Sequence, residues 1–380
     1  MNPRKKQNNS IIQIGKLDAG FLTLLLTLLV IGLIMLFSAS YPYAQAYMGN
    51  SYHFIIRQSI YAVIGVILML GVSKINYRLY KKFALIIYIA SNALLLLLLI
   101  LPPMIPSMDV KRWFVIGSFS FQPSEIAKFS IILLFSTLIS KNYKKMQSFK
   151  FGIFQLGVLL LIPCALVILE PHFSATILIF MIGVVLMIVG GIKLKYIAGG
   201  AITGVLGVAV ILLSGAISYG TSRIAYWLNP WADASGKGYQ TIQSLLAIGS
   251  GGIMGRGFAK SRQKYLWLPE PHNDFIFSVV CEELGLIGAI IIILLFCALV
   301  WRGFIIAMRA PDKFGSLMAL GLTFQVGLQA CLNILVVTNT VPNTGISLPF
   351  FSYGGTALVL LLLQMGIVLS ISRASTLEKT

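Results

Sequence analysis

Long apolar runs recur along the chain, with short polar connections between most of them. A helix needs about 20 apolar residues to cross the hydrocarbon core of a bilayer, and the runs approach that length. Inside such a core every backbone polar group must find an internal partner, which favours helices. We therefore predict an all-α polytopic membrane protein with about ten transmembrane helices, at residues 20–40, 56–73, 83–102, 123–140, 152–169, 174–192, 196–219, 275–301, 315–338 and 354–372.

Lys and Arg gather in alternate connections between these runs, as cytoplasmic loops of membrane proteins do. The basic clusters lie before residue 20 and at 74–82, 141–150, 193–195, 302–313 and 373–379. No Lys or Arg occurs in the intervening short connections, which are 41–55, 170–173 and 339–353. The alternation predicts cytoplasmic tails at 1–18 and 375–380, on either side of a membrane domain at 19–374.

The composition supports a membrane protein. Hydrophobic residues make up 58% of the 380-residue chain and charged residues only 11%, whereas soluble domains carry about 25% charged residues. The net charge of +18 would suit a nucleic-acid-binding protein. The basic residues lie in short clusters between apolar runs, however, so we predict no nucleic-acid partner.

Two longer connections fall on the side that lacks the basic clusters, at 103–122 and 220–273. The second joins the predicted seventh and eighth helices and has about 54 residues, a length typical of functional or disordered loops. It is rich in Tyr and Trp, and its apolar residues between Ile242 and Ile248 are spaced as in a short amphipathic helix. We therefore expect this outer loop to fold against the membrane domain.

The acidic residues near the outer side are candidates for chemistry, because a carboxylate at membrane depth is costly to keep. Asp274 lies where the long outer loop enters the eighth helix. It could instead cap that helix, as could its neighbour Asn273. Glu282 and Glu283 follow about two to three turns later, and we expect one of them to form an ion pair inside the bundle, with Lys128 or Arg112 as candidate partners.

The outer loop also carries basic residues, against the usual preference for the cytoplasmic side. Long loops cross the membrane largely regardless of charge, which is one explanation. The other is a site for an anionic group at the membrane surface, such as a phosphate. The glycine-rich stretch Gly249–Gly257 fits a tight turn or an anion nest. The basic residues are Arg223, Lys237, Arg256, Lys260, Arg262 and Lys264.

Several long motifs resemble the SEDS family (shape, elongation, division and sporulation), which includes FtsW and RodA. The resemblance covers nearly the whole membrane region. The motifs are Arg112-Trp-Phe, Phe121-Gln-Pro-Ser-Glu-Ile-Ala-Lys128, Glu170-Pro-His, Arg223-Ile-Ala-Tyr-Trp-Leu-Asn-Pro-Trp231, Gly238-Tyr-Gln-Thr-Ile-Gln-Ser244, Leu268-Pro-Glu-Pro-His-Asn-Asp-Phe-Ile-Phe277, Glu282-Glu-Leu-Gly285 and Gly345-Ile-Ser-Leu-Pro-Phe-Phe-Ser-Tyr-Gly-Gly355. Two stretches depart from the family pattern. Glu170-Pro-His stands where many members have Gln-Pro-Asp, and Phe114 and Val115 replace a more usual Ile-Gly after the Arg-Trp pair.

The resemblance implies a peptidoglycan glycosyltransferase that polymerises lipid II on the outer face of the bacterial cytoplasmic membrane. It makes Asp274 the catalytic residue and implies a class B penicillin-binding protein and other divisome proteins as partners. The motifs look closer to division and sporulation members, so the resemblance favours a role in division, with a RodA-like role in elongation as the alternative. Mg²⁺ or Mn²⁺ would assist with a pyrophosphate, through ligands that the sequence does not identify. Candidate pyrophosphate-binding residues are Lys111, Arg112, Arg223, Arg256, Lys260, Arg262 and Lys264, and candidate supporting residues are Glu125, Lys128, His272, Glu282, Glu283 and Ser352.

Two alternatives belong to other functional classes. Charged residues within the membrane, such as Lys128, would also suit a flippase or transporter of lipid-linked precursors. A transporter places its key charges at mid-membrane on broken helices, whereas the unusual residues here collect in the outer loop and at its margins. The other alternative is a non-catalytic scaffold of the divisome, which has no need of Asp274.

Overall fold

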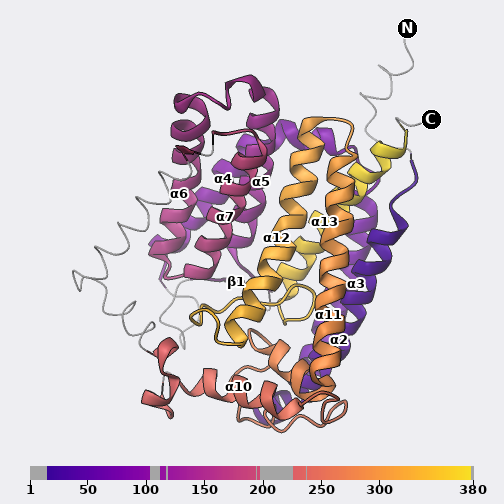
Figure 1. Cartoon of the computed structure of the whole chain (residues 1–380), viewed down its shortest axis with the longest axis vertical. Helices are drawn as coiled ribbons and strands as arrows, with labels where there is room; N and C mark the ends of the chain where they lie inside the picture. Colours follow the sequence, from indigo (N-terminus) through magenta and orange to yellow (C-terminus); the bar gives the residue numbers. More distant parts are fainter. Residues whose placement is uncertain are drawn as a thin grey trace.

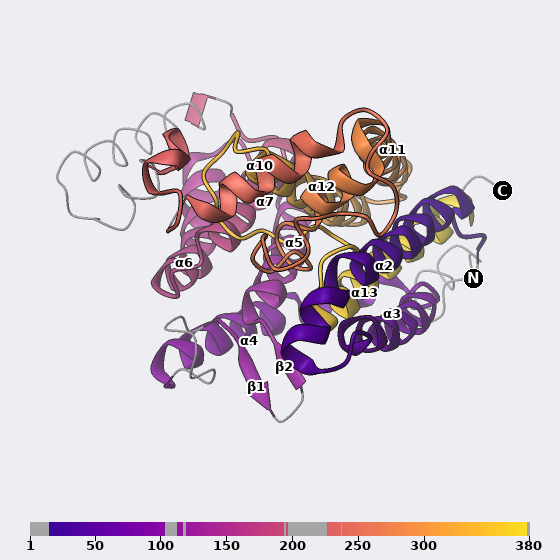
Figure 2. The same cartoon turned by 90° about the horizontal axis from the view of Figure 1, so that it is seen from below.

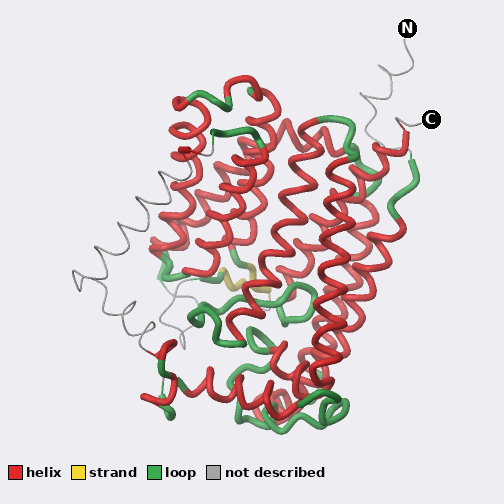
Figure 3. Tube along the Cα trace, viewed as in Figure 1, coloured by secondary structure: helices red, strands yellow, loops and turns green. Residues whose placement is uncertain are grey.

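The computed structural model describes residues 15–102, 112–116, 119–193, 195–196, 226–236 and 238–377. In these ranges, helices dominate and the strands form one two-stranded hairpin (Figure 3). The longer helices are α2 (Ala19–Met48), α3 (His53–Val72), α4 (Tyr80–Ile100), α5 (Pro123–Lys141), α6 (Leu156–Leu169), α7 (Phe173–Val189), α10 (Tyr239–Gly251), α11 (Ile276–Met308), α12 (Lys313–Val337) and α13 (Gly355–Leu377). The hairpin pairs β1 (Phe114–Ile116) with β2 (Phe119–Phe121), and a π-helical stretch, Phe149–Gln155, leads into α6.

Most of these helices run side by side as one bundle (Figure 1). Among the described residues, eight helices are long and apolar enough to cross a membrane, and α7 is a shorter apolar helix. They match the predicted spans, except that the predicted span 196–219 lies outside the described residues beyond its first position. The predicted fold class, a polytopic all-α membrane protein, is confirmed.

Large apolar side chains cover much of the outside of the bundle. Ile67 on α3, Ile86 on α4 and Leu294 on α11 are 64%, 63% and 61% exposed. Soluble monomers rarely expose apolar patches of this extent, so these faces are suited to contact lipid.

Both described ends of the chain lie at the same end of the bundle (Figure 1). The amide of Asp18 donates to Ser372 Oγ at 3.1 Å, and the Arg373 guanidinium donates to the carbonyl of Gly15 at 2.6 Å. The Asp18 carboxylate caps α2 through the amide of Phe21 and pairs with Arg302 Nε at 2.9 Å. The termini therefore share one side, and its assignment to the cytoplasm is a prediction from the charge pattern.

The outer loop folds over the opposite end, where α10 lies across the bundle (Figure 2). The buried face of α10 includes Ile242 and Ala247 and packs on α11. Ser244 Oγ lies 2.7 Å from Ser278 Oγ and donates to the carbonyl of Val337 at 2.7 Å, which connects α10 to α11 and α12. The predicted amphipathic helix and its docking on the membrane domain are both confirmed.

Helix α11 is broken at Gly285, whose φ of 68° and ψ of −169° lie outside the helical region. An unbroken helix would bond the amides of residues 286 and 287 to the carbonyls of residues 282 and 283. Instead, those amides donate to Gly252 and Ile253, and those carbonyls accept from Arg256 and Gly257. The glycine-rich stretch thus inserts into the break.

The glycines of this stretch are required by close backbone contacts. A Cβ on Gly251 would lie 2.0 Å from the carbonyl oxygen of Cys281, and one on Gly255 would lie 2.2 Å from that of Glu283. A Cβ on Gly285 would lie 2.2 Å from the amide nitrogen of Gly255. The stretch is therefore a tight docking segment, because its amides at 256 and 257 are already taken by helix carbonyls.

Candidate functional site

A cavity of about 630 Å³ lies at the end of the bundle opposite the chain termini. Its walls come from α3, α5, α7, α12 and the β hairpin, and from the segments that lead into α11 and α13. This volume lies in the range of small-molecule sites. The charged side chains that line the cavity are Arg57, Arg112, Glu125, Lys128, Glu270 and Asp274.

The Asp274 carboxylate faces this cavity and does not cap α11. The helix begins at Ile276, and its N-cap residue, Phe275, makes no side-chain capping bond. Within the part of the chain that the structure describes, no hydrogen bond to this carboxylate is found. Gly345 passes close by with a φ of +69°, and a Cβ there would lie 3.1 Å from Asp274 Oδ2. The carboxylate is therefore available to a ligand.

Burial and, to a lesser extent, the negative charge of Glu270 raise the pKa of Asp274 to about 6, while Arg112 acts in the opposite direction. At neutral pH such a carboxylate is mostly ionised, yet it accepts a proton more readily than an ordinary aspartate. Both properties suit a general base, whose pKa should lie near the working pH.

Three successive backbone carbonyls before α11 are held by hydrogen bonds. The carbonyl of His272 accepts from the amide of Tyr353 at 2.9 Å, and that of Asn273 accepts from Ser352 Oγ at 2.7 Å. The carbonyl of Asp274 accepts from Asn333 Nδ2 at 2.8 Å. These bonds fix the backbone that carries the Asp274 carboxylate. The predicted supporting residue Ser352 therefore acts on the backbone of the site.

The His272 ring packs among aromatic rings and is almost fully buried. Its centroid lies 4.3 Å from that of Phe54 and 4.9 Å from that of Tyr43. Burial lowers the pKa of His272 to about 4, so the ring is neutral at physiological pH. Its place in the structure fits a packing role beside Asp274.

A buried polar chain extends from the cavity into the bundle. Lys128 Nζ lies 2.8 Å from Glu125 Oε1 and donates to Gln329 Oε1 at 3.2 Å. Gln329 in turn donates to the carbonyl of Ser347 at 3.1 Å. Lys128 is only 1% exposed, so its charge is compensated within the protein while its side chain still lines the cavity.

A second carboxyl group lies at the end of α6. Glu170 is buried, and among the described residues neither of its carboxylate oxygens has a hydrogen-bond partner. Burial raises its pKa to about 8, against the opposing charge of Arg112. The guanidinium of Arg112 donates to the carbonyl of the next residue, Pro171. Glu170 is therefore a neutral acid at pH 7, which the sequence indicated only as a departure from the family motif.

The loop cations that the structure describes do not line the cavity. Lys264 is fully buried and pairs with Glu283, and Arg256 Nε lies 3.6 Å from Glu282 Oε1. Lys260 and Arg262 are exposed on the loop and do not line the cavity among the described residues. Lys111, Arg223 and Lys237 lie outside the described residues.

The expected partners of the two adjacent glutamates were wrong. Lys128 pairs with Glu125, and Arg112 binds a backbone carbonyl. The glutamates pair instead with Arg256 and Lys264, which lie 26 and 19 positions earlier in the chain, because the loop folds back onto α11. A single sequence gives no signal for which loop residue returns to which turn of the helix.

Sequence reasoning missed several residues of the cavity and its support. Arg57 is a basic residue in the first turns of α3, at the end of the bundle opposite the termini, where the charge pattern disfavours one. Gln329 and Asn333 are polar residues four positions apart on the apolar helix α12. Both were visible as exceptions to the pattern around them, and such exceptions within membrane spans mark functional candidates.

Among the residues that the structure describes, no group of three or more metal-ligating side chains occurs. Mg²⁺ is often held by one or two carboxylates together with substrate phosphates. Asp274 and Glu270, which line the same cavity, are the residues that fit such a shared site. The divalent cation stays a prediction.

Residues 19–377 match the model of a family described as cell cycle proteins, FtsW/RodA/SpoVE. Stage V sporulation protein E of Bacillus subtilis is 38% identical over 350 residues, which cover 92% of this chain and 95% of that protein. A protein of Geobacter metallireducens named probable peptidoglycan glycosyltransferase FtsW is 36% identical over 362 residues, 95% of this chain and 96% of that one.

Solved structures agree with these relatives. A chain from a study of structural coordination of polymerization and crosslinking by a peptidoglycan synthase complex aligns with a TM-score of 0.78 and 27% identity, over 94% of this chain and 98% of that one. The rod shape determining protein RodA of Thermus thermophilus aligns with a TM-score of 0.69 and 25% identity, over 94% and 97% of the two chains. These matches confirm the resemblance seen in the motifs: the chain belongs to the FtsW/RodA/SpoVE family.

Proposed function

We propose that this protein is a peptidoglycan glycosyltransferase that polymerises lipid II on the outer face of the bacterial cytoplasmic membrane, with Asp274 as its general base. Its family membership and the names of relatives such as the Geobacter protein support the activity. The observation that carries the assignment of the base is the Asp274 carboxylate, which lines a cavity, caps no helix and has a raised pKa.

The reaction joins the 4-hydroxyl of an acceptor sugar to the anomeric carbon of a polyprenyl-pyrophosphate-linked glycan. A new carbon–oxygen bond forms, the bond to the pyrophosphate breaks, and the hydroxyl proton passes to Asp274. A hydroxyl is a weak nucleophile at neutral pH and needs a base within hydrogen-bond reach. Asp274 supplies that base in its ionised form.

The departing pyrophosphate carries the developing negative charge, and cations aimed at such charge stabilise the transition state. Arg57 and Arg112 line the cavity, and guanidinium groups bind phosphate oxygens in a bidentate manner. Lys128 adds a third positive charge deeper in the cavity, partly offset by Glu125. A bound Mg²⁺ or Mn²⁺ would supply further neutralisation next to the pyrophosphate.

The relatives also bear on the biological role. Curated relatives at 34–38% identity are named FtsW or stage V sporulation protein E, which supports a role in division over elongation. The structural match to a peptidoglycan synthase complex supports a class B penicillin-binding protein as partner. Divisome proteins are expected as further partners.

Polymerisation of lipid II by the purified protein, together with its class B penicillin-binding protein and Mg²⁺ or Mn²⁺, tests this proposal. We expect glycan strands from the wild type and none from Asp274→Asn, which keeps the shape of the side chain but accepts no proton. Asp18→Asn is the control, since it makes the same change at a carboxylate that caps α2 at the opposite end of the bundle and does not line the cavity. Glycan strands made by Asp274→Asn would refute the role of Asp274 as the base and leave the transferase activity standing. No strands from the wild type, beside an active control enzyme, would favour the flippase or scaffold alternatives.

A further inference from the structure

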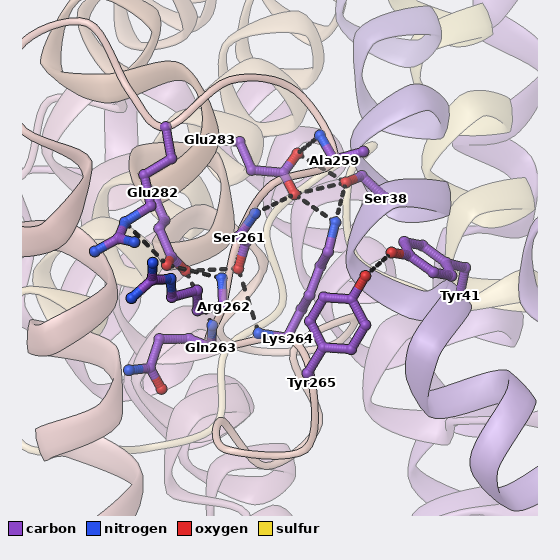
Figure 4. A network of polar contacts seen from close by, with 11 residues as sticks. Ser38, Tyr41, Ala259, Ser261, Arg262, Gln263, Lys264, Tyr265, Glu282 and Glu283 are labelled. Carbon is purple, nitrogen blue, oxygen red and sulfur yellow. Dashed lines mark hydrogen bonds and ion pairs between the residues drawn. The ribbon is translucent and has the colours of Figure 1, made fainter.

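A buried ion pair joins the outer loop to the broken helix α11, away from the cavity. Lys264 Nζ lies 2.7 Å from Glu283 Oε1, and both side chains are fully buried. Ser38 on α2 donates to the Glu283 carboxylate at 2.7 Å and accepts from Lys264 Nζ at 3.0 Å (Figure 4). We call these three residues the carboxylate clamp. It brings the loop, α11 and α2 together at one point.

The loop backbone wraps around both glutamates. Glu283 also accepts from the amide of Ala259 at 3.0 Å (Figure 4). Glu282 accepts from Ser261 Oγ at 2.5 Å and from the amide of Arg262 at 2.9 Å. Successive amides arranged in this way form a site for an anion, and here the anion comes from the protein itself. The two carboxylates are therefore well satisfied despite their burial.

The carboxylate clamp holds the C-terminal end of a short helical segment, and Asp274 lies just before the N-terminal end of the same segment. The break at Gly285 leaves residues 276–284 as an outer half of α11, about nine residues or two and a half turns. Isolated helices shorter than about 12–15 residues are marginal. This half therefore relies on contacts at both ends, which are the clamp at Glu283 and the bonds to the carbonyls at 272–274.

Helix α2 has contacts near both ends of the outer half of α11, residues 276–284. Ser38 belongs to the clamp, and one turn later the hydroxyl of Tyr41 bonds with that of Tyr265. Half a turn beyond, Tyr43 packs on His272, two residues before Asp274. The clamp and the site are therefore linked through one continuous helix as well as through α11.

A stability role alone explains this arrangement poorly. Replacing a buried ion pair by well-packed neutral residues is often neutral or stabilising, because desolvation offsets the attraction between the charges. What a fully bonded pair does provide is a fixed geometry between the elements that carry it. For a base that must meet a hydroxyl, a displacement of about 1 Å costs about 100-fold in rate.

We propose that Ser38, Lys264 and Glu283 are positioning residues, which set the placement of the outer half of α11 and so aim Asp274 into the cavity. The inference rests on the proposed transferase function. None of the three lines the cavity among the described residues, so each acts through Asp274.

The test is the double variant Lys264→Met/Glu283→Gln, which removes both charges, keeps both shapes and leaves no unpaired buried ion. Ser38→Ala is the milder second variant. We expect both to assemble with the partner and unfold near the wild-type temperature. The double variant should lose about 10- to 100-fold in kcat for lipid II polymerisation with KM nearly unchanged. Hydrogen–deuterium exchange at residues 276–284 should rise.

The control is Arg78→Met, which breaks the Arg78–Asp312 ion pair of 2.7 Å at the opposite end of the bundle and should leave kcat unchanged. A folded double variant with wild-type kcat would overturn the proposal, as would unchanged exchange at 276–284. If Arg78→Met lowered kcat as much as the double variant does, the loss would not be specific to the clamp, and this would also contradict the proposal. An inactive wild type would refute the transferase function instead, and the exchange measurement would then decide separately whether the clamp fixes the helix.

Discussion

Asn333→Leu should separate the placement of Asp274 from its chemistry. Asn333 is fully buried, and its Nδ2 donates to the carbonyl of Asp274 at 2.8 Å and to that of Ile346 at 2.6 Å. It therefore ties the backbone of the base to the segment that follows α12. Leucine has a similar size and shape but donates nothing.

The expected loss of folding stability arises because the carbonyls of Asp274 and Ile346 lose their hydrogen-bond donor. A buried polar group left without a partner costs about 1–3 kcal/mol, so the variant should lose about 2–6 kcal/mol of stability, less if the backbone relaxes. Relaxation would move Asp274, and a shift of about 1 Å lowers the rate by about 100-fold. We therefore expect kcat to fall further than the folded fraction does.

The assay is lipid II polymerisation at a temperature where thermal unfolding shows the variant to be folded. Asn92→Leu is the matched control, because among the described residues Asn92 on α4 donates to the carbonyl of Tyr88 alone, at 2.8 Å and within its own helix. It should leave kcat unchanged. A folded Asn333→Leu protein with wild-type kcat would refute the argument that this side chain places the base.

Two further outcomes follow from the structure. Gly345→Ala should reduce kcat more than Gly49→Ala. Both positions have a positive φ, but only at Gly345 would the new Cβ approach the Asp274 carboxylate, at 3.1 Å. Equal kcat in the two variants would contradict this contact. Glu170→Gln should make the protein more stable than the wild type at high pH. Burial raises the pKa of Glu170 in the folded protein to about 8, so the wild type loses stability as the pH rises from about 4.5 to 8 and loses no more above pH 8. The variant has no carboxyl group at this position and should not show this loss. Thermal unfolding as a function of pH measures the difference, and parallel curves for the two proteins would contradict the raised pKa.

The sequence predicted most of the fold because bilayer-spanning helices are encoded locally. Each needs only a sufficiently long apolar run, and even α10 was visible in the spacing of Ile242 to Ile248. The break at Gly285 was not predicted, since Glu282-Glu-Leu-Gly reads as ordinary helix until the glycine-rich stretch docks against it. A docking partner from a distant segment is not a local property.

The candidate site was predicted in part for the same reason. Asp274 stood out as a carboxylate at the edge of a membrane helix. Lys264 and Arg256 were grouped with the phosphate-binding candidates because exposed loop cations and buried ion-pair partners look alike in sequence, and only the fold distinguishes them. Arg57 was passed over because it lies just inside an apolar run, although it lines the cavity.

The most direct test of Asp274 as the base is the pH dependence of kcat/KM for lipid II polymerisation. Burial and the charge of Glu270 raise the pKa of Asp274 to about 6, and only the ionised form accepts a proton. Activity should therefore rise with pH through about 6 and level off above it. Glu270→Gln removes one of the causes and should move this rise to lower pH. A wild-type profile with no such rise, or a rise that Glu270→Gln leaves in place, would contradict the account.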